Sequence, residues 1–128
     1  MAATNNRKKT TAIPKVGANE MGKLPPQAPE LEESVLGALM IEKDAYASVA
    51  DLLRPESFYM DSNACIFEAI RSLAAQDAPI DLLSVIEQLK SQGNLEKAGG
   101  VLRLSELTRR VASAAHLRYH AQIVAQKA

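Results

Sequence analysis

The sequence predicts an all-α fold, a compact bundle of about six helices. Its length of 128 residues is typical of a single domain. Aromatic residues make up only 4% of the chain and Trp is absent, so the core must be built mostly from Leu, Ile, Val and Ala, residues that favour helix packing. Apolar residues also recur three and four positions apart from Leu31 onward, which is the period of an amphipathic helix.

Residues 1–28 are expected to form a disordered basic tail. The segment mixes Thr, Asn, Lys, Gly and Pro without an apolar period, so it cannot bury enough surface to offset the entropy of ordering. The run Arg7–Lys9 is weak evidence for a nucleic-acid contact, and a solvated tail explains it.

The helical domain is predicted over residues 29–128. Pro29 suits a first helical turn, and the acidic side chains of Glu30, Glu32 and Glu33 complement the dipole at that end. Asp44 is expected to cap a second helix that Pro55 closes, and Asp61 or Ser62 to cap a third. The predicted buried faces of these three helices are Leu31, Val35, Leu36, Leu39 and Met40, then Tyr46, Val49, Leu52 and Leu53, then Ile66, Phe67, Ile70 and Leu73.

Three more helices are predicted in the second half of the chain. Asp81 caps the fourth helix and Gly93 ends it in the left-handed conformation. Gly99 and Gly100 precede a fifth helix, and Ser113 caps a sixth that is still periodic at Ala128. The predicted buried stripes are Leu82, Leu83, Ile86 and Leu89, then Leu104, Leu107 and Val111, then Leu117, Ala121 and Val124. A second stripe on the sixth helix, His116, His120 and Ile123, offers surface for a partner.

No catalytic, cofactor-binding or metal site is predicted. A phosphate-binding loop needs Lys and Ser or Thr after its glycines, whereas Lys97 precedes Gly99 and Gly100, so this segment is interpreted as a helix connector. His116 and His120 share one helix face, but no HExxH motif supplies a further zinc ligand. Cys65 lies beside Ile66 and Phe67 and is expected to be an inert core thiol.

Charge is unevenly distributed although the formal net charge is zero. Residues 30–100 carry five basic and thirteen acidic side chains, a balance of −8, which would repel a phosphate backbone. Arg109 and Arg110 suit the dipole at the end of the fifth helix. Together with Arg103 and Arg118 they could instead form a basic strip, so a small helical DNA-binding domain stays open as an alternative function.

The sequence favours a cytoplasmic location. Cys65 is the only cysteine, so no intrachain disulfide can form. The N-terminus lacks the apolar run of a signal peptide, and no stretch of about 18 apolar residues occurs. Neither secretion nor contact with a membrane is expected.

Several segments in order resemble the N-terminal domain of the bacterial replicative DNA helicase of the DnaB family. They are PPQAPELEESVLGALM, the SFY and IFEAI pair, PIDLLSVIEQLKSQGNLEKAGG, LRLSEL and SAAHLRYHAQIV. The resemblance covers about residues 25–128, and its specificity lies in the order and spacing of the segments.

The resemblance implies a domain that ends in a helical hairpin, of which the last segment here is only the first arm. In the family this domain pairs through the hairpin and builds a collar of three dimers above a hexameric motor. It also contacts primase and, in some bacteria, a loader or initiator protein. The motor is a RecA-like ATPase that binds ATP and Mg, and it lies beyond this chain. The segment is therefore expected to act by binding, as part of a parent ATP-dependent helicase that unwinds DNA.

The same resemblance implies which residues form the partner or dimer interface. The expected set is Val101, Leu104, Leu117, Tyr119, His120, Ile123 and Val124. Four positions depart from the usual family pattern: Asn63 stands where histidine is frequent, Arg103 where an aromatic is common, Ala112 where proline is frequent and His116 where asparagine is usual. The last three of these changes could retune the interface.

Overall fold

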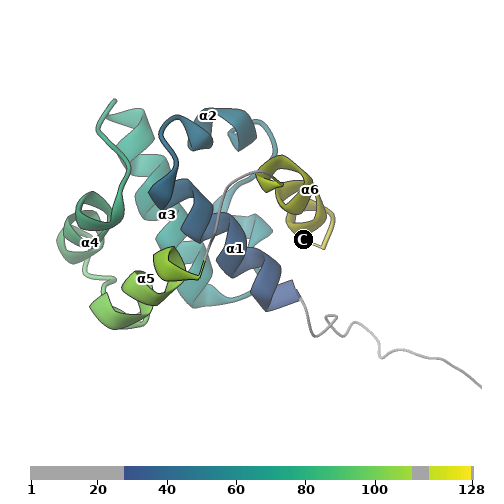
Figure 1. Ribbon diagram of the computed structural model, residues 1–128. Helices are drawn as coiled ribbons and strands as arrows, with labels where there is room; N and C mark the ends of the chain where they lie inside the picture. Colours follow the sequence, from purple (N-terminus) through teal and green to yellow (C-terminus); the bar gives the residue numbers. More distant parts are fainter. Residues whose placement is uncertain (1–27, 111–115, 128) are drawn as a thin grey trace, which may run out of the picture.

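A computed structural model describes residues 28–110 and 116–127, and the described residues contain helices and no strand. Figure 1 shows their arrangement in space. The elements in chain order are α1 (Ala28–Ile41), α2 (Ala45–Val49), a 3-10 turn η1 (Pro55–Ser57), α3 (Asp61–Ala75), α4 (Leu82–Ser91), α5 (Gly100–Arg109) and α6 (Leu117–Lys127). The predicted fold class is confirmed.

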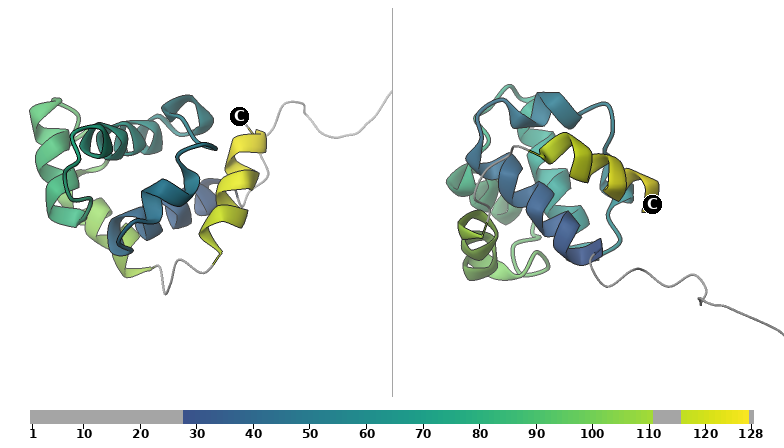
Figure 2. Two further views of the ribbon diagram at one scale, coloured as in Figure 1. Left: turned by 90° about the horizontal axis from the view of Figure 1, so that it is seen from above. Right: turned by 45° about the vertical axis from the view of Figure 1, so that its right-hand side comes forward.

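Helix α1 is the centre of the bundle. It packs most extensively against α6 and α5, and it also contacts α3, so α5 and α6 lie on either side of it (Figures 1 and 2). Its predicted stripe is correct: Val35, Leu36, Leu39 and Met40 are buried, and Leu31 is partly buried against the core. Helices α3 and α4 form a second packed pair that closes the core from the other side.

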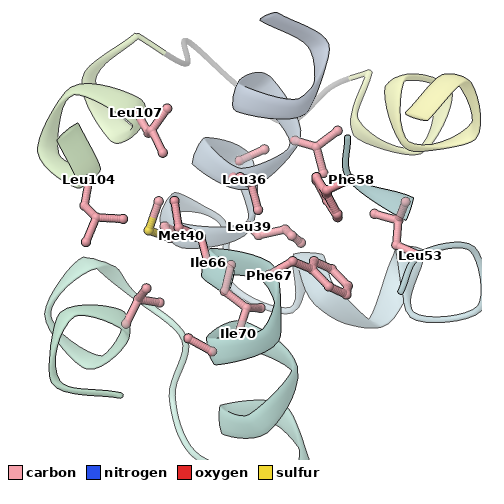
Figure 3. Close-up of a cluster of buried hydrophobic side chains, with 14 of the residues drawn as sticks. Leu36, Leu39, Met40, Leu53, Phe58, Ile66, Phe67, Ile70, Leu104 and Leu107 are labelled. Carbon is pink, nitrogen blue, oxygen red and sulfur yellow. The ribbon is translucent and has the colours of Figure 1, made fainter. Parts of the chain in front are cut away.

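The core is aliphatic with one small aromatic cluster (Figure 3). Phe67 is fully buried, and its ring stacks on Phe58 with centroids 5.1 Å apart and lies 6.0 Å from the ring of Tyr46. Such offset aromatic pairs add about 0.5–1.5 kcal/mol to the burial of their surface. The connector that contains Phe58 is thereby fixed onto α3.

Two predicted helix ends are confirmed. Asp81 caps α4: its carboxylate accepts a hydrogen bond from the Ser84 amide at 2.8 Å, and the Ser84 hydroxyl accepts one from the Asp81 amide at 2.9 Å. Gly93 follows α4 with a φ of 73°, and the amides of Gly93 and Asn94 donate to the carbonyls of Lys90 and Leu89. This pair of bonds is a Schellman motif, which needs a left-handed residue at that point.

Two predicted caps are wrong. Asp44 does precede α2, but its backbone is left-handed and its side chain makes no capping hydrogen bond. Neither Asp61 nor Ser62 caps α3, because the capping position is Met60 and Asp61 is already in the first turn. No side chain caps α3 at this position.

Two predicted helical faces need correction. Helix α2 ends at Val49, so Leu52 and Leu53 belong to the turn after it, although both still pack on or in the core. On α4, Leu83 is 69% exposed and Val85 is buried instead. Positions 82, 85, 86 and 89 follow the helical repeat and share one face, whereas position 83 is turned about 100° away from position 82.

The glycine pair before α5 has the conformation that a turn requires. Gly99 and Gly100 have φ angles of 107° and 86°, which residues with side chains rarely adopt. A Cβ on Gly99 would also collide with the side chain of Arg103. The pair therefore joins two helices, as expected. The predicted tail up to residue 27, Val111 and the Ser113 cap lie outside the described residues.

Candidate functional site: the surfaces of helices α5 and α6

Helices α5 and α6 each bury one apolar stripe in the core. On α5 the buried residues are Leu104 and Leu107, and on α6 they are Leu117, Ala121 and Val124. Both stripes match the sequence prediction within the described residues. They hold each helix on the body of the domain and leave the remaining faces for solvent or a partner.

The seven residues predicted for an interface divide into two groups. Leu104, Leu117 and Val124 are buried in the core of the chain itself, so they can support an interface from beneath but are not free to enter it. The other four keep accessible surface: Val101 and Tyr119 are exposed, and His120 and Ile123 are half-buried.

The accessible residues do not all lie on one surface. Val101 is in the first turn of α5, next to Leu102, which is 83% exposed. Tyr119, His120 and Ile123 are on α6, on the other side of α1 (Figure 2). The structure therefore brings together only the α6 group, where Tyr119 is 63% exposed and its ring centroid lies 5.9 Å from that of His120. We call Tyr119, His120 and Ile123 the outer face of α6.

A buried polar network joins α1, the start of α3 and α5. Glu32 of α1 is only 3% exposed, and its carboxylate accepts hydrogen bonds from the Tyr59 amide at 2.7 Å, the Met60 amide at 3.4 Å and the Asn63 side-chain amide at 2.9 Å. Two of these donors are the amides just before α3. Glu32 therefore ties the segment that leads into α3 to α1, whereas α3 itself has no side-chain cap.

The network continues from α3 to α5. Arg103 donates to the Asn63 side-chain oxygen at 2.6 Å and to the Ala98 carbonyl at 3.0 Å, and it forms an ion pair with Glu33 at 3.3 Å. The side-chain oxygen of Asn63 thus accepts a hydrogen bond from the Arg103 guanidinium, while its side-chain amide donates one to the Glu32 carboxylate. Asn63 and Arg103 are two of the residues that depart from the family pattern, and they contact each other directly.

The four arginines of the predicted basic strip are all engaged with carboxylates. Arg103 and Arg110 both pair with Glu33, the latter at 3.1 Å. Arg109 pairs with Glu106 one turn earlier on α5. Arg118 pairs with Asp51 at 3.2 Å and also donates to the Ser48 carbonyl. The strip is thus divided between two helices, and three carboxylates offset most of its four charges, which weighs against the DNA-binding alternative.

The pair of Arg118 and Asp51 joins α6 to the turn after α2. The two guanidinium nitrogens each meet one carboxylate oxygen at 3.2 Å, a bidentate arrangement. This hydrogen bonding with Arg118 holds the pKa of Asp51 below its ordinary value of 3.8. Both groups are exposed, so water screens the pair and its contribution lies in orientation more than in stability.

The other candidate groups have structural roles. Cys65 is buried, its thiol donates to the Ser62 carbonyl at 3.2 Å, and burial raises the pKa of the thiol. The His116 and His120 rings are 6.1 Å apart. Among the residues that the structure describes, no three His, Cys, Asp or Glu side chains gather as metal ligands. Within the same residues, no helix is long and apolar enough to cross a bilayer.

Sequence reasoning missed the Glu32 network. Glu32 was interpreted as an exposed charge at a helix start, yet it lies three and four residues before Val35 and Leu36 and so shares their buried face. This spacing was the one signal in the sequence that could have indicated a buried Glu32. The partners of Glu32 are about 30 residues away, however, and no local pattern identifies them.

Comparison with known proteins gives the same family from sequence and from fold. Residues 24–126 match the family described as the DnaB-like helicase N terminal domain. The replicative DNA helicase DnaB of Rhodothermus marinus is 50% identical over 108 residues, which cover 84% of this chain and 12% of that protein. The corresponding helicase of Geobacillus stearothermophilus is 39% identical over 105 residues, which cover 82% of this chain and 23% of that protein.

Two solved structures are similar to the fold described above. The N-terminal domain of DnaB helicase from Mycobacterium tuberculosis superposes with a TM-score of 0.76 and 38% identity, over 81% of this chain and 72% of that one. A DnaB-like replicative helicase, solved in a study of its interactions with primase, superposes with a TM-score of 0.66 and 25% identity, over 77% of this chain and 23% of that one.

Within the described residues the fold is a small helical domain whose outer face on α6 stays accessible. The comparisons then identify the particular kind: the chain belongs to the family of DnaB-like helicase N-terminal domains. It spans less than a quarter of the length of these two curated helicases.

Proposed function

We propose that this chain is the N-terminal collar domain of a replicative DNA helicase, which assembles the hexameric ring and docks primase at the replication fork. The observation that carries the proposal is the outer face of α6. This face remains accessible after α6 has buried Leu117, Ala121 and Val124 in the core. A helix with a second apolar stripe gains by burying it against another helix.

The geometry supports pairing through α6 with a second copy. The core stripe holds α6 along α1, and the bidentate contact of Arg118 with Asp51 fixes its first turn. Tyr119 then presents an aromatic ring at a defined position, and rigid aromatic side chains are the usual anchors of interfaces. In a two-fold symmetric dimer the same outer face would be used by both partners.

The proposed partners and chemistry of the parent protein are based on its relatives. The structural neighbour solved in a study of its interactions with primase supports primase as a partner. A loader or initiator protein, and DNA through the full-length helicase, complete the proposed set. ATP and Mg would bind only in the RecA-like motor, where hydrolysis drives unwinding. The location would be the cytoplasm, where the bacterial chromosome is replicated.

Sedimentation tests the pairing. We compare the 128-residue chain with a chain extended by about 30 residues of its parent to include the second hairpin arm. We expect the extended chain to dimerise and its Tyr119→Ala/Ile123→Ala variant to dissociate. The exposed double change Gln122→Ala/Gln126→Ala on the same helix is the control. A monomeric mass for the unaltered extended chain would contradict the pairing.

Calorimetry tests primase docking. The extended chain is titrated with the C-terminal helical region of primase, and we expect measurable heat at micromolar concentration. No heat at high micromolar concentration, with a chain that dimerises normally, would refute direct docking while leaving the assembly role intact.

A further inference from the structure

A groove of about 680 Å³ lies away from the network and the outer face of α6. It is formed where the end of α1, the start of α2 and the connection from α3 to α4 come together. Its interior is largely apolar and includes the half-buried side chains of Tyr46 and Ile80. Its rim carries the carboxylates of Glu42, Asp44, Asp77 and Asp81.

The rim concentrates four carboxylates around one groove. Lys43 is the one basic residue that lines the groove, so four acidic groups and one basic group give a local charge of −3. None of the four carboxylates takes part in an ion pair between described residues, whereas Arg71, Arg103, Arg109, Arg110 and Arg118 are each paired elsewhere. The groove therefore combines an apolar floor with an uncompensated acidic rim.

We infer that this groove binds the basic N-terminal segment of the same chain, residues 7–16. That segment reads RKKTTAIPKV and places Ile13, Pro14 and Val16 around Lys15, with three basic residues before them. Its apolar side chains fit the floor, and its four cations, without an acidic residue among them, complement the rim. This inference goes beyond the proposed assembly role and does not depend on it.

The length of chain before α1 permits this contact and limits which residues can make it. The groove lies at the far end of α1, and a helix of 14 residues is about 21 Å long. Lys15 is 13 residues before Ala28, a reach of at most about 43 Å when extended. Lys23 is only five residues before it and reaches at most about 17 Å. Residues 7–16 can therefore reach the groove, whereas the backbone of Lys23 falls short of the far end of α1.

The first experiment measures amide chemical shifts of the isotope-labelled 128-residue chain by NMR. Replacing the four cations together, Arg7→Gln/Lys8→Gln/Lys9→Gln/Lys15→Gln, should move the amide signals of Tyr46, Ala47, Ala78 and Ile80. Lys23→Gln is the matched control and should leave them in place. Unmoved groove signals in a folded four-cation variant would overturn the inference. A response that grows with protein concentration would overturn docking within one chain and indicate docking between chains.

The second experiment alters the groove and measures the tail. Asp44→Asn/Asp77→Asn removes two rim charges while keeping side chains that tolerate the left-handed backbone found at both positions. We expect the rate of trypsin cleavage after Lys9 and Lys15 to rise about threefold, as fits the loss of two exposed charge contacts. The exposed pair Glu56→Gln/Glu96→Gln should leave the rate unchanged. Equal rates for all three proteins, or an equal rise in both variants, would reject the groove as the binding site.

Discussion

Glu32 shows how a single buried carboxylate organises three parts of this fold. It accepts hydrogen bonds from two amides that precede α3 and from Asn63, which in turn accepts one from Arg103 of α5. A buried charge is expensive unless hydrogen bonds satisfy it, and here three donors do so. The connector around Tyr59 is consequently tied to α1.

We predict that Glu32→Ala lowers the free energy of unfolding by about 3 kcal/mol, because it leaves buried donors without an acceptor. Glu32→Gln keeps one acceptor oxygen and should cost about half as much. Urea denaturation followed by circular dichroism measures both. A loss below about 0.5 kcal/mol for the alanine variant, the range of ordinary surface changes, would show that water replaces the carboxylate.

The ion pair of Asp51 with Arg118 predicts a dependence on pH. The pKa of Asp51 is lowered in the folded chain, so the pair stabilises the fold above the ordinary value of 3.8 and this contribution is lost as pH falls through the folded value. The difference in melting temperature between the unaltered chain and Asp51→Asn should therefore be present at about pH 6 and shrink as pH falls below 3.8. A difference that persists in acid would exclude the ion pair as its source.

At the scale of elements, α3 and α4 end with the same motif built from different residues. After α4 the left-handed position is Gly93, and after α3 it is Asp77, with a φ of 60°. The amides of Asp77 and Ala78 donate to the carbonyls of Ala74 and Leu73, as Gly93 and Asn94 do after α4. The geometry of the turn is therefore fixed by hydrogen bonds, and the residue type decides only its conformational cost.

This equivalence predicts stability changes of opposite sign. Gly93→Ala should destabilise the chain by about 1 kcal/mol through the left-handed backbone alone, since a Cβ there meets no atom within 4 Å. Asp77→Gly should stabilise it by about 0.5 kcal/mol, because glycine adopts this conformation freely. Thermal and urea unfolding of both variants provide the measurement. Changes of the same sign would mean that side-chain contacts outweigh backbone conformation at one of the two ends.

At the scale of the molecule, the position of α6 depends on close packing against α1. Ala121 is fully buried in the α6 stripe, and Gly37 of α1 is buried as well. Small residues let two helices approach closely, so a larger side chain at such a position forces them apart.

We predict that Ala121→Leu destabilises the chain by about 1–3 kcal/mol through overpacking. The neighbouring exposed change Gln122→Leu adds the same side chain outside the core and should change stability by less than about 0.5 kcal/mol. Hydrogen exchange of the α6 amides locates the effect, which should be largest in α6 for the first variant. Equal effects of the two substitutions would indicate that α6 is not tightly packed.

The pairing of charged residues is also decided at the scale of the whole molecule. The sequence has four arginines near the end of the chain, and a basic strip was the alternative to a role at the helix end. Folding pairs them with Glu33, Glu106 and Asp51, of which only Glu106 is a neighbour in sequence. The four carboxylates of the groove rim come from two separate stretches of the chain, and Lys43 is the one basic residue that lines the groove with them.

The sequence by itself determined the helical class, most of the buried stripes, the Asp81 cap, the Gly93 end and the glycine pair before α5. These features depend on residues within about four positions of one another, where helical geometry converts spacing directly into contact. The order of its segments was also enough to indicate the DnaB family, which the comparisons confirm.

Only the tertiary structure decided which polar residues are buried and which interface candidates remain free. Glu32 meets Asn63 and Arg118 meets Asp51 across separations of 31 and 67 residues, and Leu104, Leu117 and Val124 are enclosed by helices distant in sequence. The segment before α3 is likewise held by Glu32 of α1, and Asp61 does not cap the helix. Hydrogen bonds and burial of this kind depend on the packing of whole helices, and helical periodicity fixes the face that a helix buries but not the residues that it meets there.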